Sequence, residues 1–141
     1  MLGKFITKSL DETKQLAGKI AIEVSVGNVI ALIGDLGTGK TAFAQGFAKA
    51  MGVKETVGSP TFKLISEYEG IKYLLYHIDC YRLRNVQQFI NIGGEEYLAP
   101  NEGVTLIEWA DIIEEILPND IIIIKFTRIS GEPNYREIII S

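Results

Sequence analysis

The sequence predicts an α/β fold in which a mixed β-sheet carries helices on both faces. Short apolar segments of strand length alternate with stretches whose apolar residues recur at helical spacing. A glycine-rich loop joins one of these apolar segments to one of these helical stretches. Two further pairs of strand-like segments flank short glycine-containing turns, which is typical of hairpins. Hairpins add antiparallel strands, so the expected sheet is mixed rather than purely parallel.

The first part of the chain predicts a strand, a helix, a second strand and a second helix. Residues 5–7 have the composition of a short strand. Ser9, followed three residues later by Glu12, forms a capping-box pattern and predicts that a helix starts here. Residues 29–33 are all apolar, which is typical of a buried strand. The second helix follows the glycine-rich loop and stops at Gly52.

The remainder of the chain predicts two hairpins that flank a helical region, a buried strand and a short helix. The expected elements are strands at 59–68 and 71–79, two short helical pieces within 85–97, a strand at 104–108, a helix at 110–117, and strands at 121–129 and 135–140. The turn of the first hairpin falls at Glu69-Gly70, and that of the second at residues 131–134.

Size and composition indicate a single domain that spans residues 1–141. Hydrophobic residues make up 47% of the chain and charged residues 23%, as expected for a globular protein with one core. No apolar run has the length of a membrane span, and the first residues lack the apolar core of a signal peptide. Cys80 is the only cysteine, so an intramolecular disulfide is excluded. From these features we expect a cytoplasmic protein that does not bind a membrane. We also expect the isolated protein to be a monomer.

The charge balance argues against direct binding of nucleic acid. The net charge is −4, and the 14 lysines and arginines are dispersed along the chain. A protein that binds nucleic acid by itself usually carries a basic face. Any contact with RNA is therefore expected to be indirect, through a partner.

Residues 34–41 read Gly-Asp-Leu-Gly-Thr-Gly-Lys-Thr and match the phosphate-binding pattern G-x-x-x-x-G-K-[ST] at every fixed position. Glycines let consecutive backbone N–H groups turn inward around an anion, and the following helix adds its positive end. Lys40 is expected to reach the β- and γ-phosphates, and the Thr41 hydroxyl to be an oxygen ligand for Mg²⁺. The fold is thus predicted to be a three-layer P-loop NTPase-like fold. The alternative is a glycine-rich turn without a ligand.

Hydrolysis also needs an acidic group near the metal ion and a group that places the attacking water. Glu108 ends an apolar segment and resembles a Walker B carboxylate, which can bind Mg²⁺ directly or through water or act as a general base. Asp79 ends a second such segment. Thr61 can hydrogen-bond a γ-phosphate or a metal-bound water, as a switch threonine does. The alternatives are solvated charges for the two acids and a turn position for Thr61.

Three other residues have less specific interpretations. His77 is the only histidine and lies on an apolar segment, where a structural role is the usual one. Trp109 follows Glu108 and either packs in the core or senses the nucleotide site. Cys80 is interpreted as a small buried residue.

Five segments occur in a set order and spacing. They are the glycine loop at 34–41, Ser-Pro-Thr-Phe at 59–62, His-Ile-Asp-Cys-Tyr-Arg-Leu at 77–83, Gly-Glu-Glu-Tyr-Leu at 94–98, and Ile-Glu-Trp at 107–109. In this combination the chain resembles the TsaE family, also called YjeE, over nearly its whole length. The resemblance implies a small Mg²⁺-dependent ATPase, weak when alone, that works in the synthesis of tRNA threonylcarbamoyladenosine (t6A). It implies a partner, the TsaD–TsaB complex, which the ATPase cycles or activates.

The resemblance also implies roles for individual residues. Thr41 and Glu108 would hold Mg²⁺, while Asp79 and Thr61 would support the γ-phosphate and its water. Asp11 and Arg136 are looser candidates for the adenosine pocket. The implied phosphate-binding residues are Gly37, Thr38, Gly39, Lys40, Thr41 and Ala42, and the implied catalytic residues are Glu108, Asp79, Lys40 and Thr61.

Three other functions are alternatives to the ATPase that the resemblance implies. A small-molecule or nucleoside kinase uses the same loop but commonly needs cationic groups in a lid, and none of the four arginines lies in an obvious lid insertion. A GTP-dependent switch is disfavoured because no asparagine is followed by lysine, so the guanine-reading N-K-x-D is absent. The third alternative, a module that binds ATP without hydrolysing it, is not excluded by the sequence.

Overall fold

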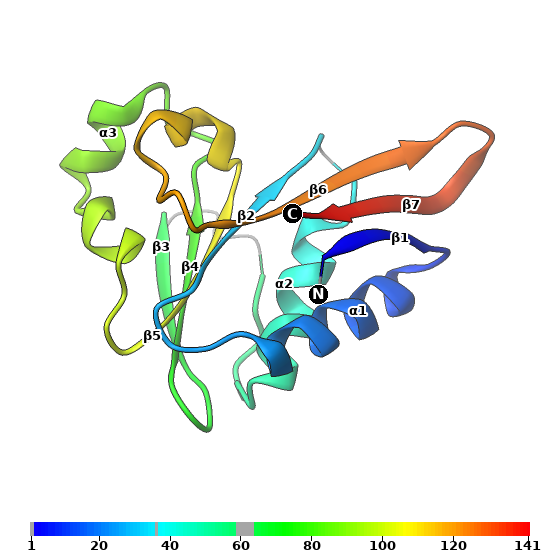
Figure 1. Ribbon diagram of the computed structural model, residues 1–141, viewed down its shortest axis with the longest axis horizontal. Helices are drawn as coiled ribbons and strands as arrows, with labels where there is room; N and C mark the ends of the chain where they lie inside the picture. The colour runs from blue at the N-terminus through cyan, green and yellow to red at the C-terminus, as the bar shows by residue number, and fades with distance from the viewer. Residues whose placement is uncertain (1, 36, 59–63) are drawn as a thin grey trace.

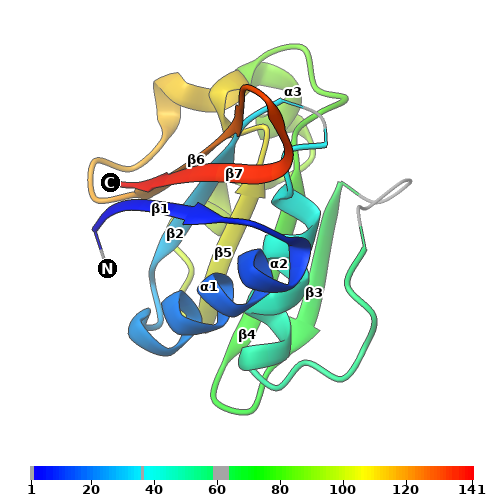
Figure 2. The same ribbon diagram turned by 90° about the vertical axis from the view of Figure 1, so that its right-hand side faces the viewer.

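The computed structural model describes residues 2–35, 37–58 and 64–141 (Figures 1 and 2). In chain order the elements are β1 (Gly3–Thr7), α1 (Leu10–Glu23), β2 (Val29–Ile33), α2 (Lys40–Ala50), β3 (Ile65–Glu69), β4 (Leu74–Asp79), α3 (Val86–Asn91), the 3₁₀ helix η1 (Gly94–Leu98), β5 (Gly103–Glu108), the 3₁₀ helix η2 (Ala110–Ile116), β6 (Ile122–Ile129) and β7 (Glu132–Ile140).

The strands form one seven-stranded sheet in the order β1-β7-β6-β2-β5-β4-β3. The four central strands, β6, β2, β5 and β4, run parallel to one another. The hairpin partners β3 and β7 pair antiparallel with β4 and β6, and β1 pairs antiparallel with β7 at the edge. The predicted mixed α/β sheet is therefore confirmed.

Helices cover both faces of this sheet, as predicted (Figure 1). On one face α1 and α2 pack against the strands, with Phe43 and Phe47 fully buried among strand residues. On the other face α3 and η2 bring Phe89 and Ile113 against Ile107 of β5. The central strand β5 is buried along its whole length because it has helices on both sides. For this reason all six residues of β5 are buried, and buried and exposed residues do not alternate along the strand.

The start of α1 follows from the predicted cap. The Ser9 hydroxyl accepts a hydrogen bond from the backbone N–H of Glu12 at 3.1 Å. The Glu12 carboxylate reaches back to the N–H of Lys8 at 2.9 Å, one residue before the usual partner of a capping box. Two backbone N–H groups at this turn are thus paired by side chains.

Four predicted elements differ from the structure. The turn of the second hairpin, expected at residues 131–134, is Ser130-Gly131, because β7 begins at Glu132, which pairs with Ile129. The strand expected from residue 71 begins at Leu74, because the N–H of Ile71 donates to Met51 O at the end of α2 and that of Gly70 to Tyr73 O. The helix expected at 110–117 is 3₁₀ rather than α, with a break in its backbone angles at Ile113. The strand expected at 59–68 is described only in part, since residues 59–63 lie outside the described residues and β3 begins at Ile65.

The sheet order sets up the functional edge of the molecule. The parallel strands β2, β5 and β4 all point their carboxyl ends the same way, so the loop after β2 lies next to the ends of β5 and β4. In register, Glu108 pairs with Leu32 on one side and with Asp79 on the other. Ligands of open α/β sheets bind at this edge. Among the described residues, no helix has both the length and the apolar composition needed to cross a membrane.

Candidate functional site

The glycine-rich loop links the end of β2 to the start of α2. A Cβ at Gly34 would lie 2.8 Å from the carbonyl oxygen of Phe126, so only glycine lets the loop leave the sheet this close to β6. Gly39 caps α2 with a φ of 101°, a backbone conformation that favours glycine. The hydroxyl of Thr38 is buried and donates to Asp35 O at 2.6 Å, which closes the loop on itself. The N-terminal end of an eleven-residue helix therefore opens at the carboxyl edge of the sheet.

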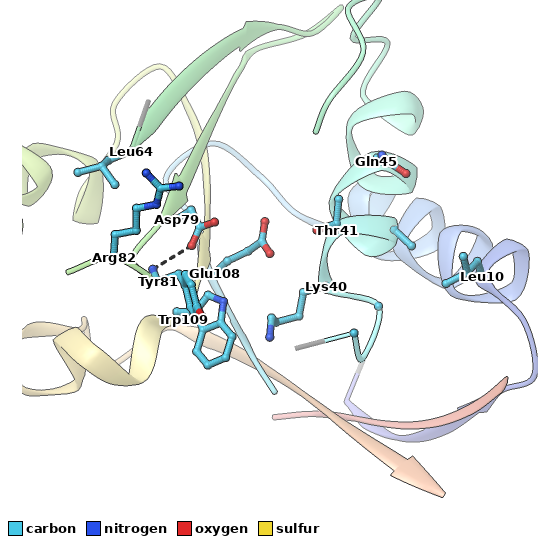
Figure 3. A pocket seen from close by; sticks show the side chains of 13 residues that line it. Leu10, Lys40, Thr41, Gln45, Leu64, Asp79, Tyr81, Arg82, Glu108 and Trp109 are labelled. Carbon is cyan, nitrogen blue, oxygen red and sulfur yellow. Dashed lines mark hydrogen bonds between the residues drawn. The ribbon is translucent and has the colours of Figure 1, made fainter. Parts of the chain in front are cut away.

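A cavity of about 590 Å³ lies at this edge, between the loop, the first turn of α2 and the ends of β4 and β5 (Figure 3). Its lining residues are Leu10, Gly37, Gly39, Lys40, Thr41, Ala42, Gln45, Leu64, Asp79, Tyr81, Arg82, Glu108 and Trp109. The loop and both predicted carboxylates thus face one space.

Lys40 is 5% exposed, and its ammonium group lies against the loop rather than in solvent. Nζ donates to the carbonyl oxygens of Gly34 and Asp35, the second at 3.0 Å, and lies 4.0 Å from the centre of the Trp109 ring. Burial lowers the pKa of Lys40, and the nearby carboxylates, Glu108 first, oppose that shift. A second source of negative charge in the cavity would favour the ammonium form further.

Glu108 and Asp79 are both buried, at 3% and 8% exposure. Oε2 of Glu108 lies 2.6 Å from Nε2 of His77, which is itself fully buried. Oδ1 of Asp79 accepts a hydrogen bond from the N–H of Tyr81 at 2.9 Å. The interpretation of these two acids as solvated charges at strand ends is therefore wrong.

The oxygen donors around the cavity suit Mg²⁺. This ion is usually held by one or two carboxylates together with phosphate oxygens and water. Thr41, Glu108 and Asp79 line the same space from α2, β5 and β4. In the part of the chain that the structure describes, no three His, Cys, Asp or Glu residues gather into a metal cluster. Two carboxylates and a hydroxyl are a donor set of hard oxygens that fits Mg²⁺.

Trp109 has an unusual backbone conformation directly after Glu108. Its φ of 57° is the only positive value among the described non-glycine residues. Strained backbone of this kind is often found at functional sites. The indole ring packs on Tyr81, with ring centres 4.9 Å apart, and takes the ammonium group of Lys40 on its face. Trp109 therefore contacts the phosphate-binding loop through Lys40 and does more than fill the core.

The other predicted site residues are placed less centrally. Asp11 is exposed on α1 and does not line the cavity, whereas its neighbour Leu10 does. Arg136 does not line the cavity but contacts the loop, since its Nη2 donates to Gly37 O at 3.1 Å. Thr61, with the rest of the segment 59–62, lies outside the described residues.

Three residues at or beside the cavity are not among the predicted site residues. His77 is predicted to be structural and is fully buried, but its contact with Glu108 is not predicted. A signal was present, because His77 lies two residues before Asp79 and so faces the same side of β4. Tyr81 and Arg82 also line the cavity, and both belong to the segment 77–83.

Cys80 is fully buried, as predicted. Burial, with Asp79 and Asp111 nearby, raises the pKa of its thiol to about 12. A thiol with this pKa is protonated at neutral pH, so Cys80 is not a nucleophile of the site.

Replacing Arg136 by alanine is expected to weaken nucleotide binding by about fivefold, since one hydrogen bond from a charged group to the loop is lost, worth about 1 kcal/mol at this exposed position. The measurement is calorimetric titration with ATP. Arg84→Ala is the matched control, because Arg84 is exposed before α3 and removes the same charge away from the loop. Equal affinities for both variants would contradict a role of Arg136 at the loop.

The strand, glycine loop and helix, with two acids at the neighbouring strand ends, define a P-loop NTPase-like protein. The family model described as "Threonylcarbamoyl adenosine biosynthesis protein TsaE" matches residues 7–138. The chain belongs to the TsaE family.

Individual relatives agree with this assignment. A TsaE protein of Bacillus subtilis is 43% identical over 117 residues, which cover 83% of this chain and 72% of that protein. A TsaE protein of Treponema pallidum is 34% identical over 136 residues, covering 96% and 98%. The crystal structure of Bacillus subtilis YdiB superposes with a TM-score of 0.78 at 36% identity, covering 99% of this chain and 86% of that one.

Proposed function

We propose that this chain is a Mg²⁺-dependent ATPase of t6A biosynthesis, which cycles or activates a TsaD–TsaB complex and meets tRNA only through it. The observation that supports the proposal best is the cavity in which Lys40 and Thr41 face two buried carboxylates, Glu108 and Asp79. Membership of the TsaE family supports the place in t6A biosynthesis and the choice of partner.

The loop side of the cavity supplies the phosphate-binding groups. Backbone N–H groups of residues 37–42 and the positive end of α2 attract a polyphosphate. Lys40 adds a cation that is already desolvated, so its interaction with a phosphate oxygen is stronger than that of an exposed lysine. Mg²⁺, when bound, would neutralise phosphate charge and orient the γ-phosphoryl group.

The sheet side of the cavity supplies the acids. Glu108 is the candidate metal ligand with Thr41, and either Glu108 or Asp79 can orient or deprotonate the attacking water. Asp79 is held in place by the N–H of Tyr81, so its second oxygen keeps a fixed direction. A positioned acid beside a phosphate-binding loop is one of the groups that hydrolysis requires.

The test is the release of phosphate from Mg²⁺-ATP by the purified chain, alone and with purified TsaD and TsaB of the same organism. We expect slow release by the chain alone and marked stimulation by the two partners. The same reactions with ³²P-labelled ATP and small-molecule extract detect a phosphorylated acceptor. Equal rates with and without partners would contradict the proposed cycling, and a labelled acceptor would support the kinase alternative.

A further inference from the structure

We propose that His77 is a positioning residue of this site: it holds one oxygen of Glu108 and thereby directs the other toward the nucleotide cavity. The inference extends the proposed function, because it assigns to a residue outside the cavity lining the task of orienting the candidate metal ligand. It is carried by the contact between His77 and Glu108 and by the burial of both side chains.

The sheet register brings the two residues together. Asp79 at the end of β4 pairs with Glu108 at the end of β5, and His77 lies two residues earlier on the same face of β4. His77 is therefore the diagonal neighbour of Glu108, within reach of a long side chain. The Nε2–Oε2 distance is 2.6 Å, and the exposures are 0% and 3%.

The chemistry of the pair fixes which atom donates. When the Glu108 carboxylate is ionised it can only accept, and Nε2 of His77 is then the donor. The other ring nitrogen, Nδ1, is also buried and has no hydrogen-bond partner among the described residues. Within this part of the chain, the hydrogen bond of the ring is therefore the one to Glu108. Burying a polar ring with a single partner costs more than burying an apolar side chain of similar size, so stability alone does not explain a histidine here.

The position of Lys40 explains why the Glu108 carboxylate needs to be held by a hydrogen bond from His77. Among the described residues, Lys40 is the only buried lysine or arginine, and Glu108 is the first of the carboxylates that raise its pKa. A direct ion pair between them would remove both the cation and the carboxylate from the phosphate and metal positions. The hydrogen bond from His77 holds Oε2 on the β4 side, while Glu108 points into the cavity and Lys40 lies against Trp109 (Figure 3). Partners of this kind, which orient a metal ligand without touching the metal, commonly change metal affinity or activity by about 10–100-fold.

Two polar substitutions separate positioning from a merely structural role. The amide nitrogen of His77→Gln reaches about as far as Nε2, whereas that of His77→Asn reaches only as far as Nδ1, the nitrogen without a described partner. His77→Leu removes both polar groups and keeps the comparison available if the asparagine variant does not fold. Thermal melts first establish which variants are folded.

The main readout is the gain in affinity that Mg²⁺ gives to a non-hydrolysable ATP analogue, measured by calorimetry with Mg²⁺ and with EDTA. We expect His77→Gln to keep this gain within about threefold, and His77→Asn and His77→Leu to lose about tenfold or more. In the ATPase assay the same two variants should lose kcat with little change in the KM for ATP.

Equal magnesium gains in the wild-type chain, His77→Asn and His77→Leu would overturn the inference, as would an asparagine variant that matches the glutamine variant. The calorimetric result does not depend on hydrolysis. If the wild-type chain binds the analogue with Mg²⁺ but releases no phosphate from ATP, the proposed function is contradicted. The binding data alone then decide the role of His77.

Discussion

Replacing Glu108 by glutamine is expected to reduce phosphate release by about 10²–10⁴-fold, the usual contribution of a positioned acid or base. Glutamine preserves the volume of the side chain and an oxygen that can still accept from His77 Nε2, so the fold and the cavity stay intact. What is lost is the negative charge that faces Lys40 and Thr41 across the cavity. Steady-state release of phosphate from Mg²⁺-ATP measures the change.

The same variant distinguishes turnover from simple binding. If hydrolysis drives the cycling of TsaD–TsaB, Glu108→Gln should bind the complex and remain trapped on it, which gel filtration with ATP detects. Asp111→Asn is the matched control, because Asp111 is an exposed acid near Lys40 that does not line the cavity. It should keep at least half of the wild-type rate. An unaltered cycling rate in Glu108→Gln would count against the turnover account.

Replacing Gly46 by alanine should destabilise the protein by about 1–3 kcal/mol, the usual cost of overpacking. Gly46 lies in α2, where an added Cβ would be 2.5 Å from the carbonyl oxygen and 2.6 Å from the Cα of Lys14 in α1. Both contacts are with backbone, so a change of rotamer cannot relieve them, and the two helices must separate. The free energy of unfolding in urea measures the effect.

Gly18→Ala makes the same chemical change in the same helix pair with the opposite expected sign. Its Cβ would meet the Cβ of Ala50 at 3.6 Å, an ordinary contact. In the interior of α1, alanine is favoured over glycine by about 0.5–1 kcal/mol. Gly18→Ala should therefore be at least as stable as the wild-type chain. A Gly46→Ala variant as stable as Gly18→Ala would contradict the close packing of α1 on α2.

The parts of the fold that the sequence predicts are those with a short-range signal. Ser9 caps α1 because its hydroxyl reaches an N–H only three residues away. The buried strand at residues 29–33 is predicted by its wholly apolar composition, and the strand at 104–108 by Val, Leu and Ile close together before Glu108. The start of β4 at Leu74 has no such signal, because it depends on a contact with another element, the bond from Ile71 to the end of α2.

The candidate site shows the same difference between features with a local sequence signal and features that depend on distant residues. The strand, glycine-rich loop and helix at residues 29–50 could be predicted, because this pattern is continuous in sequence. That Asp79 and Glu108 end buried strands was also predictable from each segment alone. The identity of Arg136 as a contact of Gly37 was not, since the two residues are 99 positions apart.

By itself the sequence determined which groups this protein carries: a glycine-rich loop that matches the phosphate-binding pattern, a lysine and threonine at its end, and two carboxylates at strand ends. Only the tertiary structure decided how these groups meet. The order of the parallel strands places Asp79 beside Glu108, and the diagonal across β4 and β5 gives Glu108 its contact with His77, 31 residues away. The physical reason is that strand pairing is chosen by the burial of whole faces of the sheet, a property that no single segment contains.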